Sequence, residues 1–241
     1  MGQNDLFDLL RNNPYPGRGI VLGLTPDGKN AALAYFIMGR SAGSRSRAFV
    51  KKGNDLGIHM LDSGKIADTS LILYAPLRTQ NDVTIVTNGD QTDTIYRALS
   101  EGKTFEDALK TRTFEPDAPH FTPRISGMQR FDGEYSYKLS ILKAGDAEGI
   151  TTLRETFDYE PLSGAGHFIS TYQTDGAVLP SFSGEPAAVG LPNDFYAFAD
   201  GLWYALNKEN KVSLYVRYTN LSSGIYEDEI YNQYAAEGTK A

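Results

Sequence analysis

Apolar residues along the chain fall into many short runs, which are separated by turn residues and predict strands. The first two runs, 19–25 and 31–38, are joined by Pro26-Asp27-Gly28, a sequence typical of a tight turn. Further runs of the same kind predict strands at 47–52, 56–61, 69–76, 82–87, 122–129, 134–143, 150–158, 166–173 and 212–218. So many short strands indicate that β-sheet makes up most of the fold.

Helices are predicted in a few places only. The segments with helical spacing or a helix-start signal are 5–11, 91–101, a segment that begins near Thr104, and 194–207. Thr104 and Asp107 have the spacing of a capping box, and Asn193 is predicted to be the N-cap of the last helix. Because the helices are grouped apart from the strands, the pattern favours an α+β fold over a doubly wound parallel sheet. With no internal repeat or linker, we expect residues 1–241 to form a single domain.

Composition and charge exclude several classes of function. The 241 residues contain no cysteine, which excludes disulfides, zinc–thiolate sites, iron–sulfur clusters and a cysteine nucleophile. The formal net charge is −7, and this disfavours general nucleic-acid binding, because such proteins usually carry a basic excess. An anionic small molecule would therefore need a local group of positive side chains.

The chain carries no recognised signal for a membrane, a metal or a cofactor. No apolar run is long enough to span a bilayer, and the first residues lack the basic start and apolar stretch of a signal peptide. We therefore expect a cytoplasmic protein with no membrane partner. The three histidines, His59, His120 and His167, have no metal-ligand spacing, and no phosphate-loop motif occurs. The sequence predicts no metal and no cofactor.

Three polar clusters are candidates for chemistry. The first is the loop after the second predicted strand, where Arg40, Arg45 and Arg47 stand among glycines and serines. Arginine offers a planar fork of donors that matches a phosphate, while glycine lets backbone N–H groups approach an anion. A solvated polar loop explains the same composition equally well.

The second and third clusters also have structural explanations. Asn88-Gly89-Asp90 lies at a strand-to-helix junction, where free N–H groups welcome anions, but helix capping accounts for Asp90 or Thr92 without any ligand. Thr122-Pro123-Arg124 opens a predicted strand, and its arginine has either a ligand or a carboxylate as a partner. Each cluster alone is a weak signal.

Taken in order, these clusters resemble one family, the archaeal-type IMP cyclohydrolases and their bacterial branch. The resemblance covers residues 15–172 and rests on Tyr15-x-Gly17-Arg18, Tyr35-x4-Arg40-Ser41-x2-Ser44-Arg45, Asn88-Gly89-x2-Thr92-Asp93-Thr94-Ile95, Thr122-Pro123-Arg124-Ile125 and Ile169-Ser170-Thr171-Tyr172. The family pattern has Asn where this chain has Ser44, and Cys near the position of Pro76.

The resemblance implies a fold, a substrate and a reaction. The fold is a four-layer αββα sandwich similar to that of N-terminal-nucleophile hydrolases. The reaction is the dehydrative ring closure of FAICAR, a purine ribotide, to IMP in purine biosynthesis, without cofactor or metal. The carboxamide nitrogen attacks the formyl carbon, so the site needs a proton acceptor, donors for the developing oxyanion and an acid. The resemblance leaves homo-oligomerisation open.

Residue roles also follow from the resemblance. Tyr74 and Glu115 occupy positions where family members place a tyrosine and a glutamate in the site, and Arg40 is assigned with them as catalytic. Arg40 and Arg45 suit the phosphate or the oxyanion. The substrate-binding residues are predicted to be Arg18, Arg45, Asn88, Thr92, Asp93 and Arg124.

Two other functions remain open at this level. One is a regulatory protein that binds purine nucleotides in the same pocket without catalysis, which the departures at Ser44 and Pro76 motivate. The other is an amide hydrolase of the N-terminal-nucleophile type. Such enzymes need Ser, Thr or Cys at the mature N-terminus, and residue 2 here is Gly.

Overall fold

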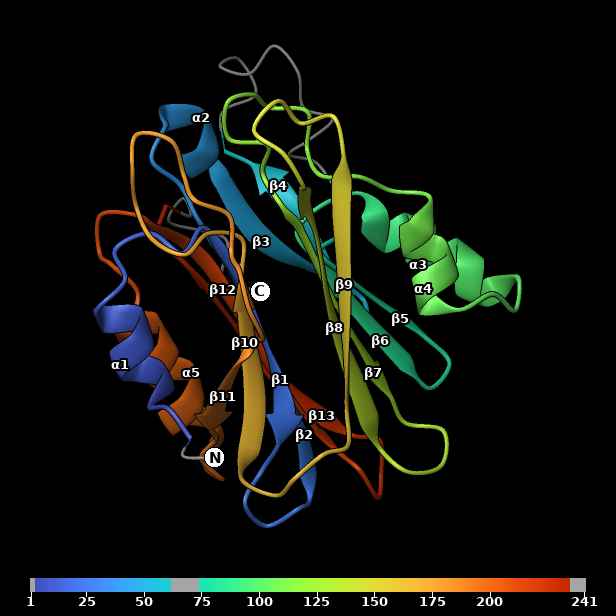
Figure 1. Cartoon of the computed structure of the whole chain (residues 1–241). Helices are drawn as coiled ribbons and strands as arrows, with labels where there is room; N and C mark the ends of the chain where they lie inside the picture. The colour runs from blue at the N-terminus through green and yellow to red at the C-terminus, as the bar shows by residue number, and fades with distance from the viewer. Residues whose placement is uncertain (1–2, 62–73, 235–241) are drawn as a thin grey trace.

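The computed structural model describes residues 3–61 and 74–234, which form two antiparallel sheets with a few helices outside them (Figure 1). The helices are α1 (Leu6–Arg11), α2 (Ala42–Arg45), α3 (Gln91–Ser100), α4 (Phe105–Lys110) and α5 (Phe195–Ala205). The strands are β1 (Arg18–Leu24), β2 (Asn30–Met38), β3 (Arg47–Lys52), β4 (Asp55–Met60), β5 (Leu77–Gln80), β6 (Val83–Thr87), β7 (Arg124–Arg130), β8 (Ser136–Ala144), β9 (Thr152–Tyr159), β10 (Ala165–Ser170), β11 (Ala187–Gly190), β12 (Lys211–Asn220) and β13 (Tyr226–Asn232).

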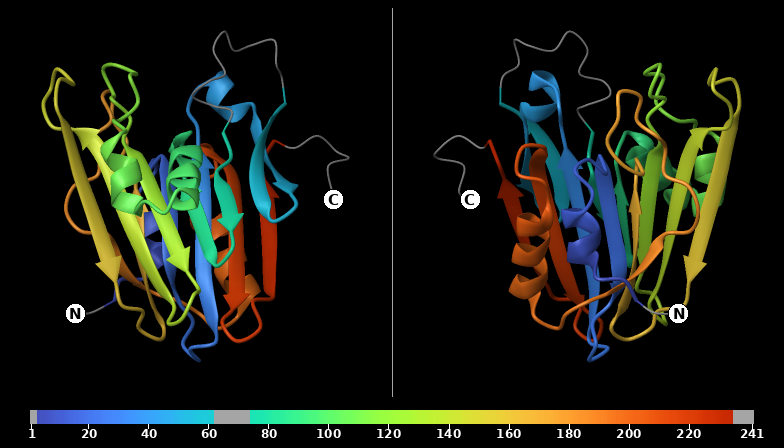
Figure 2. Two further views of the ribbon diagram at one scale, coloured as in Figure 1. Left: turned by 90° about the vertical axis from the view of Figure 1, so that its right-hand side faces the viewer. Right: turned by 60° about the vertical axis from the view of Figure 1, so that its left-hand side comes forward.

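The chain builds the two sheets in three stages. It starts the first sheet with β1 and β2, then forms the second sheet in the order β3-β4-β5-β6-β7-β8-β9. It returns with β10 to β13 to complete the first sheet, whose order is β11-β10-β1-β2-β12-β13. Neighbouring strands run antiparallel in both sheets, and short connections join β1 to β2, β5 to β6, β7 to β8 and β8 to β9. The two sheets face each other, as the two views of Figure 2 show.

Strand β2 shows why the first sheet is buried on both faces. Side chains alternate along a strand, so Ala34 and Phe36 face one side while Leu33 and Tyr35 face the other. The first pair packs with α1 and α5, and the second pair packs against the second sheet. Both faces are therefore apolar, which explains why this strand reads as a nearly continuous hydrophobic run.

Helices cover the outer face of each sheet. Phe198 and Leu202 of α5 lie in a core with Leu6 and Leu10 of α1 and with the first sheet. On the other side, α3 and α4 pack on the second sheet in a smaller core that contains Ile95, Leu109 and strand residues. None of the helices in the described part of the chain is long and apolar enough to cross a membrane.

Several predicted elements are confirmed. The helices predicted at 5–11 and 91–101 correspond to α1 and α3. The capping box is also confirmed, because the Thr104 side chain accepts from the Asp107 N–H and Asp107 accepts in return. The antiparallel arrangement agrees with the prediction of an α+β fold and excludes a doubly wound parallel sheet among the described residues.

Other predictions about boundaries need correction. The N-cap of α5 is Asp194, which accepts from the Ala197 N–H at 2.6 Å, while Asn193 accepts from the Asp27 N–H at 3.0 Å. Asn and Asp are equally good caps, so spacing alone could not choose between neighbours. Of the predicted strand 69–76, residues 69–73 lie outside the described residues, and the strand of this region begins only at Leu77. Pro76 has no N–H for a ladder hydrogen bond, which accounts for the later start.

Candidate active site

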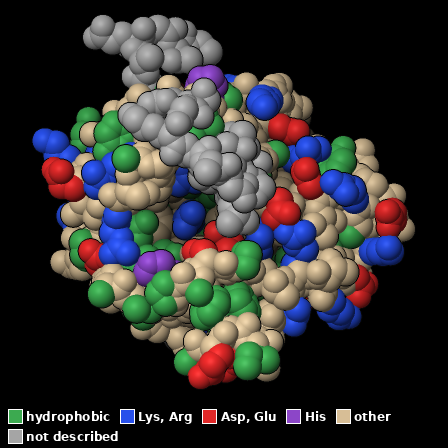
Figure 3. All heavy atoms as spheres, turned by 90° about the horizontal axis from the view of Figure 1, so that it is seen from above, with side chains coloured by type: hydrophobic (Ala, Val, Ile, Leu, Met, Phe, Trp, Pro, Cys, Tyr) green, Lys and Arg blue, Asp and Glu red, His purple; other side chains and the backbone are tan. Residues whose placement is uncertain are grey.

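Buried polar residues gather between the sheets at the end where β1, β3 and β7 begin and β2 and β10 end. Figure 3 looks down on this end and shows basic and acidic side chains around a hollow. Five residues in this region act on one another through hydrogen bonding or charge, and we call them the inter-sheet cluster: Arg18, Tyr35, Arg47, Tyr74 and Glu115. Three of the five, Arg18, Tyr74 and Glu115, are residues that the sequence predicts for the site. The cluster comes from five separate segments of the chain.

The backbone of Arg18 is held in place by two hydrogen bonds to Thr171. Its N–H donates to the Thr171 hydroxyl at 3.1 Å, and its carbonyl accepts from the Thr171 N–H at 2.9 Å. Gly17 precedes it with a φ of +79°, and a side chain there would collide with Thr171 and Tyr172, so glycine allows this close approach. The Arg18 guanidinium has no hydrogen bond or ion pair to any described residue, and its Nε is buried.

Glu115 lies at the base of a closed loop. Its N–H donates to the Thr122 carbonyl at 2.9 Å, and the Thr122 N–H donates to Asp117 at 2.6 Å, so the loop ends are held together. The Glu115 side chain is only 4% exposed, and its Oε1 is buried without a hydrogen-bond partner. Burial raises the pKa of Glu115, and the opposing attraction of Arg18 is not enough to cancel this effect.

Tyr74 is paired with a second tyrosine that the sequence analysis did not assign to the site. The hydroxyl oxygens of Tyr35 and Tyr74 lie 2.8 Å apart, and both side chains are buried. Burial raises the pKa of both phenols, while the positive charges of Arg47 and Arg18 oppose the increase for Tyr74. Tyr74 is therefore a neutral hydroxyl near pH 7, able to donate a proton.

Arg47 is a fully buried arginine that the sequence analysis counted in the arginine-rich loop and as the first residue of the strand predicted at 47–52, without assigning it to the site. It is the first residue of β3 and is 1% exposed. Because side chains alternate along a strand, it points to the same side as Phe49, whose ring stacks on Tyr35 at 5.5 Å. Its Nε donates to the Ser44 carbonyl at 3.0 Å, its single hydrogen bond to the described residues. Burial and the like charge of Arg18 lower the pKa of Arg47, which still stays charged at neutral pH.

Buried charges without partners are costly and indicate a ligand site. Isolated ions inside a protein carry a desolvation penalty of several kcal/mol each, so native structures usually pair them. Arg18 and Glu115 are close enough to shift each other's pKa, yet they form no ion pair in the described structure. Ionisable groups with perturbed pKa values and no ion-pair partner are typical of binding and catalytic sites.

Arg40, the third residue predicted to be catalytic, lies beside the cluster and already has partners. Its guanidinium donates to Asp175 at 2.7 Å and to the Gly176 carbonyl at 2.8 Å, and it lies over the Tyr15 ring. Tyr15 in turn stacks on Tyr172 with 6.0 Å between the ring centres. Arg40 would have to leave Asp175 in order to bind a phosphate.

The remaining predicted binding residues make hydrogen bonds within the protein. Arg45 donates to the Gly39 carbonyl at 2.9 Å. Asn88 is fully buried and joins β6 to β7, since its amide donates to the Pro123 carbonyl at 2.9 Å and accepts from the Ile125 N–H at 2.8 Å. Thr92 donates to the Gly89 carbonyl at 3.0 Å. We call Asn88, Asp90, Gln91, Thr92 and Arg124 the helix-start cluster.

Arg124 and Asp93 are both in ion pairs. Arg124 donates to Asp90 at 2.7 Å and to the Gln91 side chain at 2.8 Å, and Asp90 also binds Arg112. Asp93 lies 2.8 Å from Arg78, outside the geometry of a hydrogen bond. Arg124 still acts on Glu115, because its charge opposes the increase in the pKa of that carboxyl. The ligand-binding roles of all these residues remain predictions.

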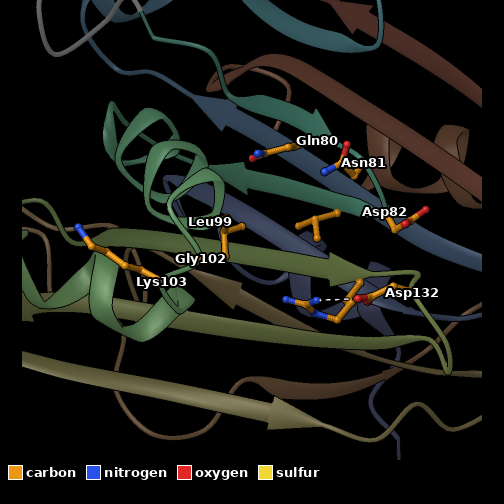
Figure 4. A pocket seen from close by; sticks show the side chains of 9 residues that line it. Gln80, Asn81, Asp82, Leu99, Gly102, Lys103 and Asp132 are labelled. Atoms are coloured by element: carbon orange, nitrogen blue, oxygen red, sulfur yellow. Dashed lines mark hydrogen bonds and ion pairs between the residues drawn. The ribbon is translucent and has the colours of Figure 1, made fainter.

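A surface groove lies elsewhere on the described part of the chain (Figure 4). It has a volume of about 360 Å³ and lies between the β5–β6 turn, the α3–α4 connection and the β7–β8 turn, far along β6 from Asn88. Its charged pair, Arg130 and Asp132, is satisfied at 2.9 Å. The groove contains none of the predicted site residues. Within residues 3–61 and 74–234, no three acidic or histidine side chains are close enough to hold a metal ion.

The sequence is similar to archaeal proteins of one activity. A protein named IMP cyclohydrolase from Methanothrix thermoacetophila is 28% identical over 165 residues, which cover 63% of this chain and 80% of that protein. One of the same name from Methanococcus maripaludis strain C7 is 34% identical over 125 residues, which cover 50% of this chain and 61% of that protein. A third, from Methanopyrus kandleri, is 33% identical over 115 residues, 46% of this chain and 57% of that protein.

A family model gives the broadest match. The model is described as IMP cyclohydrolase-like protein and matches residues 15–224. This span begins just before Arg18 and includes every member of the inter-sheet cluster. The predicted resemblance is thereby confirmed: the chain belongs to the IMP cyclohydrolase-like family.

Proposed function

We propose that the protein is an IMP cyclohydrolase, which closes the second ring of the purine by converting FAICAR to IMP with loss of water. Family membership and the activity named for its relatives support the reaction. The observation that carries the proposal for this chain is the pair of opposite charges, the partly buried Arg18 and the buried Glu115, which have no hydrogen-bond or ion-pair partner among the described residues and lie near the neutral hydroxyl of Tyr74.

The chemistry matches what the cluster offers. The amide nitrogen of the substrate is a weak nucleophile, because its lone pair is delocalised, so a base must take its proton as it attacks the formyl carbon. Glu115 is the base in this proposal, and Arg18 helps to keep its carboxylate ionised despite burial. Tyr74 donates to the formyl oxygen, which gains negative charge in the attack. Positioned proton transfer typically contributes about 10²–10⁴-fold to a rate.

The other predicted residues complete the proposal. Arg40 and Arg45 bind the phosphate at the rim, while Asn88, Thr92, Asp93 and Arg124 support the ribose and base or hold the backbone that does so. The fold is proposed to be a four-layer αββα sandwich of the kind found in N-terminal-nucleophile hydrolases, formed by residues 1–241 as one domain. A cytoplasmic location and a mechanism without metal or cofactor belong to the same proposal.

A direct assay tests the function. Purified protein is incubated with FAICAR, and formation of IMP is followed by absorbance and confirmed by chromatography. The Glu115→Gln variant is the matched control, since it keeps the shape of the side chain and removes the base. Conversion by the wild type and not by the variant supports the proposal. Tight binding of IMP without any conversion of FAICAR would instead identify a nucleotide-binding regulatory protein, the alternative motivated by Ser44 and Pro76.

A further inference from the structure

The inter-sheet cluster contains two side chains, Tyr35 and Arg47, to which the proposed function gives no role. Both lie beside Tyr74. Tyr35 reaches it by a hydroxyl–hydroxyl contact of 2.8 Å, and Arg47 points into the same space from β3, on the side where Phe49 stacks on Tyr35. All three side chains are buried, so few water molecules compete for their polar groups.

We propose that Tyr35 and Arg47 are positioning residues that act through Tyr74, so that the three side chains form one proton-donating unit. This inference rests on the proposed function, because it names the groups that make Tyr74 an acid in that reaction. The unit is distinct from the Arg18–Glu115 pair, which serves the base. The two halves of the cluster thus carry out the two proton transfers that ring closure requires.

The steps balance as follows. The carboxamide nitrogen bonds to the formyl carbon and passes one N–H proton to Glu115, while Tyr74 gives its hydroxyl proton to the formyl oxygen and becomes a tyrosinate. When the C–O bond breaks, the proton on Glu115 goes to the departing hydroxyl, which leaves as water. As water leaves, the former formamide nitrogen forms a C=N bond to the same carbon and gives its N–H proton to the Tyr74 tyrosinate. Both protein groups end in their starting states.

Tyr35 stabilises the tyrosinate by a hydrogen bond. Burial raises the pKa of Tyr35 well above its ordinary value, and the contact with Tyr74 raises it further, whereas the same contact lowers the pKa of Tyr74. Tyr35 therefore keeps its proton and donates to the Tyr74 oxygen. A hydrogen bond to a charged acceptor is roughly twice as strong as one between neutral groups, so the contact strengthens when Tyr74 ionises.

Arg47 supplies the positive charge that stabilises the Tyr74 tyrosinate. Only one of its five N–H donors binds a described residue, the Ser44 carbonyl, and no carboxylate pairs with it in the described structure. Another buried arginine, Arg217, shows the usual arrangement: its guanidinium donates to the Asn54 carbonyl at 2.9 Å, lies over the Tyr226 ring, and has Asp228 at 3.7 Å. Arg47 lacks such a counterion, so its positive charge acts on the phenols beside it.

The first arm of the test measures the acidity of position 74 without catalysis. The variant Tyr74→3-nitrotyrosine gives this one phenol its own absorbance, so its ionisation can be followed apart from the other tyrosines. Adding Arg47→Met should lower the acid dissociation constant of this phenol by about tenfold or more, and adding Tyr35→Phe should lower it less. Adding Arg217→Met, the matched loss of a buried arginine at the other end of the sheets, should leave it unchanged.

The second arm measures turnover of FAICAR per folded molecule. Arg47→Met and Tyr35→Phe should each lower kcat by about tenfold or more, and Arg47→Lys should keep more activity than Arg47→Met because it retains the charge. In the Tyr74→Phe background neither change should lower kcat further, because their effect passes through the missing hydroxyl.

The outcomes separate this inference from the proposed function. If the acidity at position 74 shifts as expected but the wild type converts no FAICAR, the proton-donating unit stands and the proposed reaction is wrong. If the wild type is active and Arg47→Met leaves the acidity unchanged, or lowers kcat equally in the Tyr74→Phe background, the inference is overturned. The latter result would mean that Arg47 binds the substrate directly.

Discussion

The inter-sheet cluster and the helix-start cluster are both polar and mostly buried, but they differ in whether their charged groups have partners. In the helix-start cluster, Asn88 links two strands, and Arg124 is paired with Asp90. In the inter-sheet cluster, Arg18 and Glu115 have no hydrogen-bond or ion-pair partners for their charged groups in the described structure. A satisfied buried network stabilises a fold, whereas an unsatisfied one needs a ligand to offset its desolvation cost.

This difference indicates a structural role for one cluster and a role in turnover for the other. The helix-start cluster holds β6, β7 and α3 in register around the place where Glu115 and Arg124 approach each other. In the proposed function, the charged groups of the inter-sheet cluster contact the bound substrate. Substitutions in the first are therefore expected to change mainly stability, and substitutions in the second mainly turnover.

Removing the Glu115 charge should have the largest effect on turnover. Glu115→Gln is expected to lower kcat and kcat/KM together by about 10²–10⁴-fold, the usual range for a positioned general base. The melting temperature should stay the same or rise, because burial raises the pKa of this carboxyl and the charge therefore opposes folding at neutral pH. Steady-state kinetics and thermal unfolding of the same preparation measure both.

The control is Glu106→Gln, in a carboxylate of α4 that lies 2.8 Å from Lys138 and outside the cluster. Its kcat should match that of the wild type. A Glu115→Gln protein with normal turnover per folded molecule and a lower melting temperature would make Glu115 a structural residue and remove the contrast between the clusters.

Asn88→Ala should cause the largest loss of stability in the helix-start cluster. The change leaves the Pro123 carbonyl and the Ile125 N–H without their partners in a fully buried place. Each buried unsatisfied group costs about 1–3 kcal/mol, so we expect denaturant unfolding to show a loss in that range or above it. Asn12→Ala, at an exposed position, should change stability by no more than about 0.5 kcal/mol.

The opposite result would also be informative. If Asn88→Ala unfolds like the wild type but loses affinity for IMP, the amide is a ligand contact and the helix-start cluster is not a purely structural network.

Strand patterns in the sequence predict the sheets well, and the reasons for the misses are physical. The runs at 19–25 and 31–38 become β1 and β2 because both of their faces are buried. Strand β13, Tyr226–Asn232, was not predicted, because this edge strand carries acidic residues and lacks an apolar face. Strand β11 was not predicted either, because its four residues are too few to show a strand pattern.

The candidate site could be predicted only in part. Resemblance to a family supplied Tyr74 and Glu115, whose catalytic roles remain predictions. Arg47 was not assigned to the site, because three arginines in a Gly/Ser-rich segment are typical of a solvated loop. The strand predicted at 47–52 does begin at this residue, but only the pairing of the strands shows that its side chain points between the sheets and is buried. The partners of Arg40 and Arg45 likewise lie far away in sequence, at Asp175 and Asn210.

The stability difference between Glu115→Gln and the wild type should depend on pH. The pKa of Glu115 is raised in the folded state, so this group favours folding below its unfolded pKa, and that contribution is lost as the pH rises through the folded pKa. The stability advantage of Glu115→Gln over the wild type should therefore grow as the pH rises. Thermal unfolding at a series of pH values measures it.

Asp146 provides a control of opposite sign. Hydrogen bonds from the Thr151 hydroxyl and from backbone N–H groups lower the pKa of Asp146 to about 2. Its contribution is present above the unfolded pKa and is lost as the pH falls towards 2, so the stability deficit of Asp146→Asn should shrink in acid. A Glu115→Gln difference that stays constant with pH would show that the carboxyl has a partner in solution.

The smallest effect is expected at the rim, where Arg40 is neither buried without partners nor part of a rigid network. Asp175 holds it at 2.7 Å, and both side chains are more than a third exposed, so the ion pair is worth at most about 1 kcal/mol. If Arg40 binds the substrate phosphate, it must first leave Asp175, and the two anions compete. Asp175→Asn should then lower KM by about two- to fivefold with kcat unchanged, since the energy of breaking the pair is no longer needed. Raising the ionic strength should reduce the difference between variant and wild type, because salt screens exposed pairs. An increase in KM for Asp175→Asn would mean that Asp175 orients Arg40 for the ligand, and the rim would then be preorganised in the same way as the helix-start cluster.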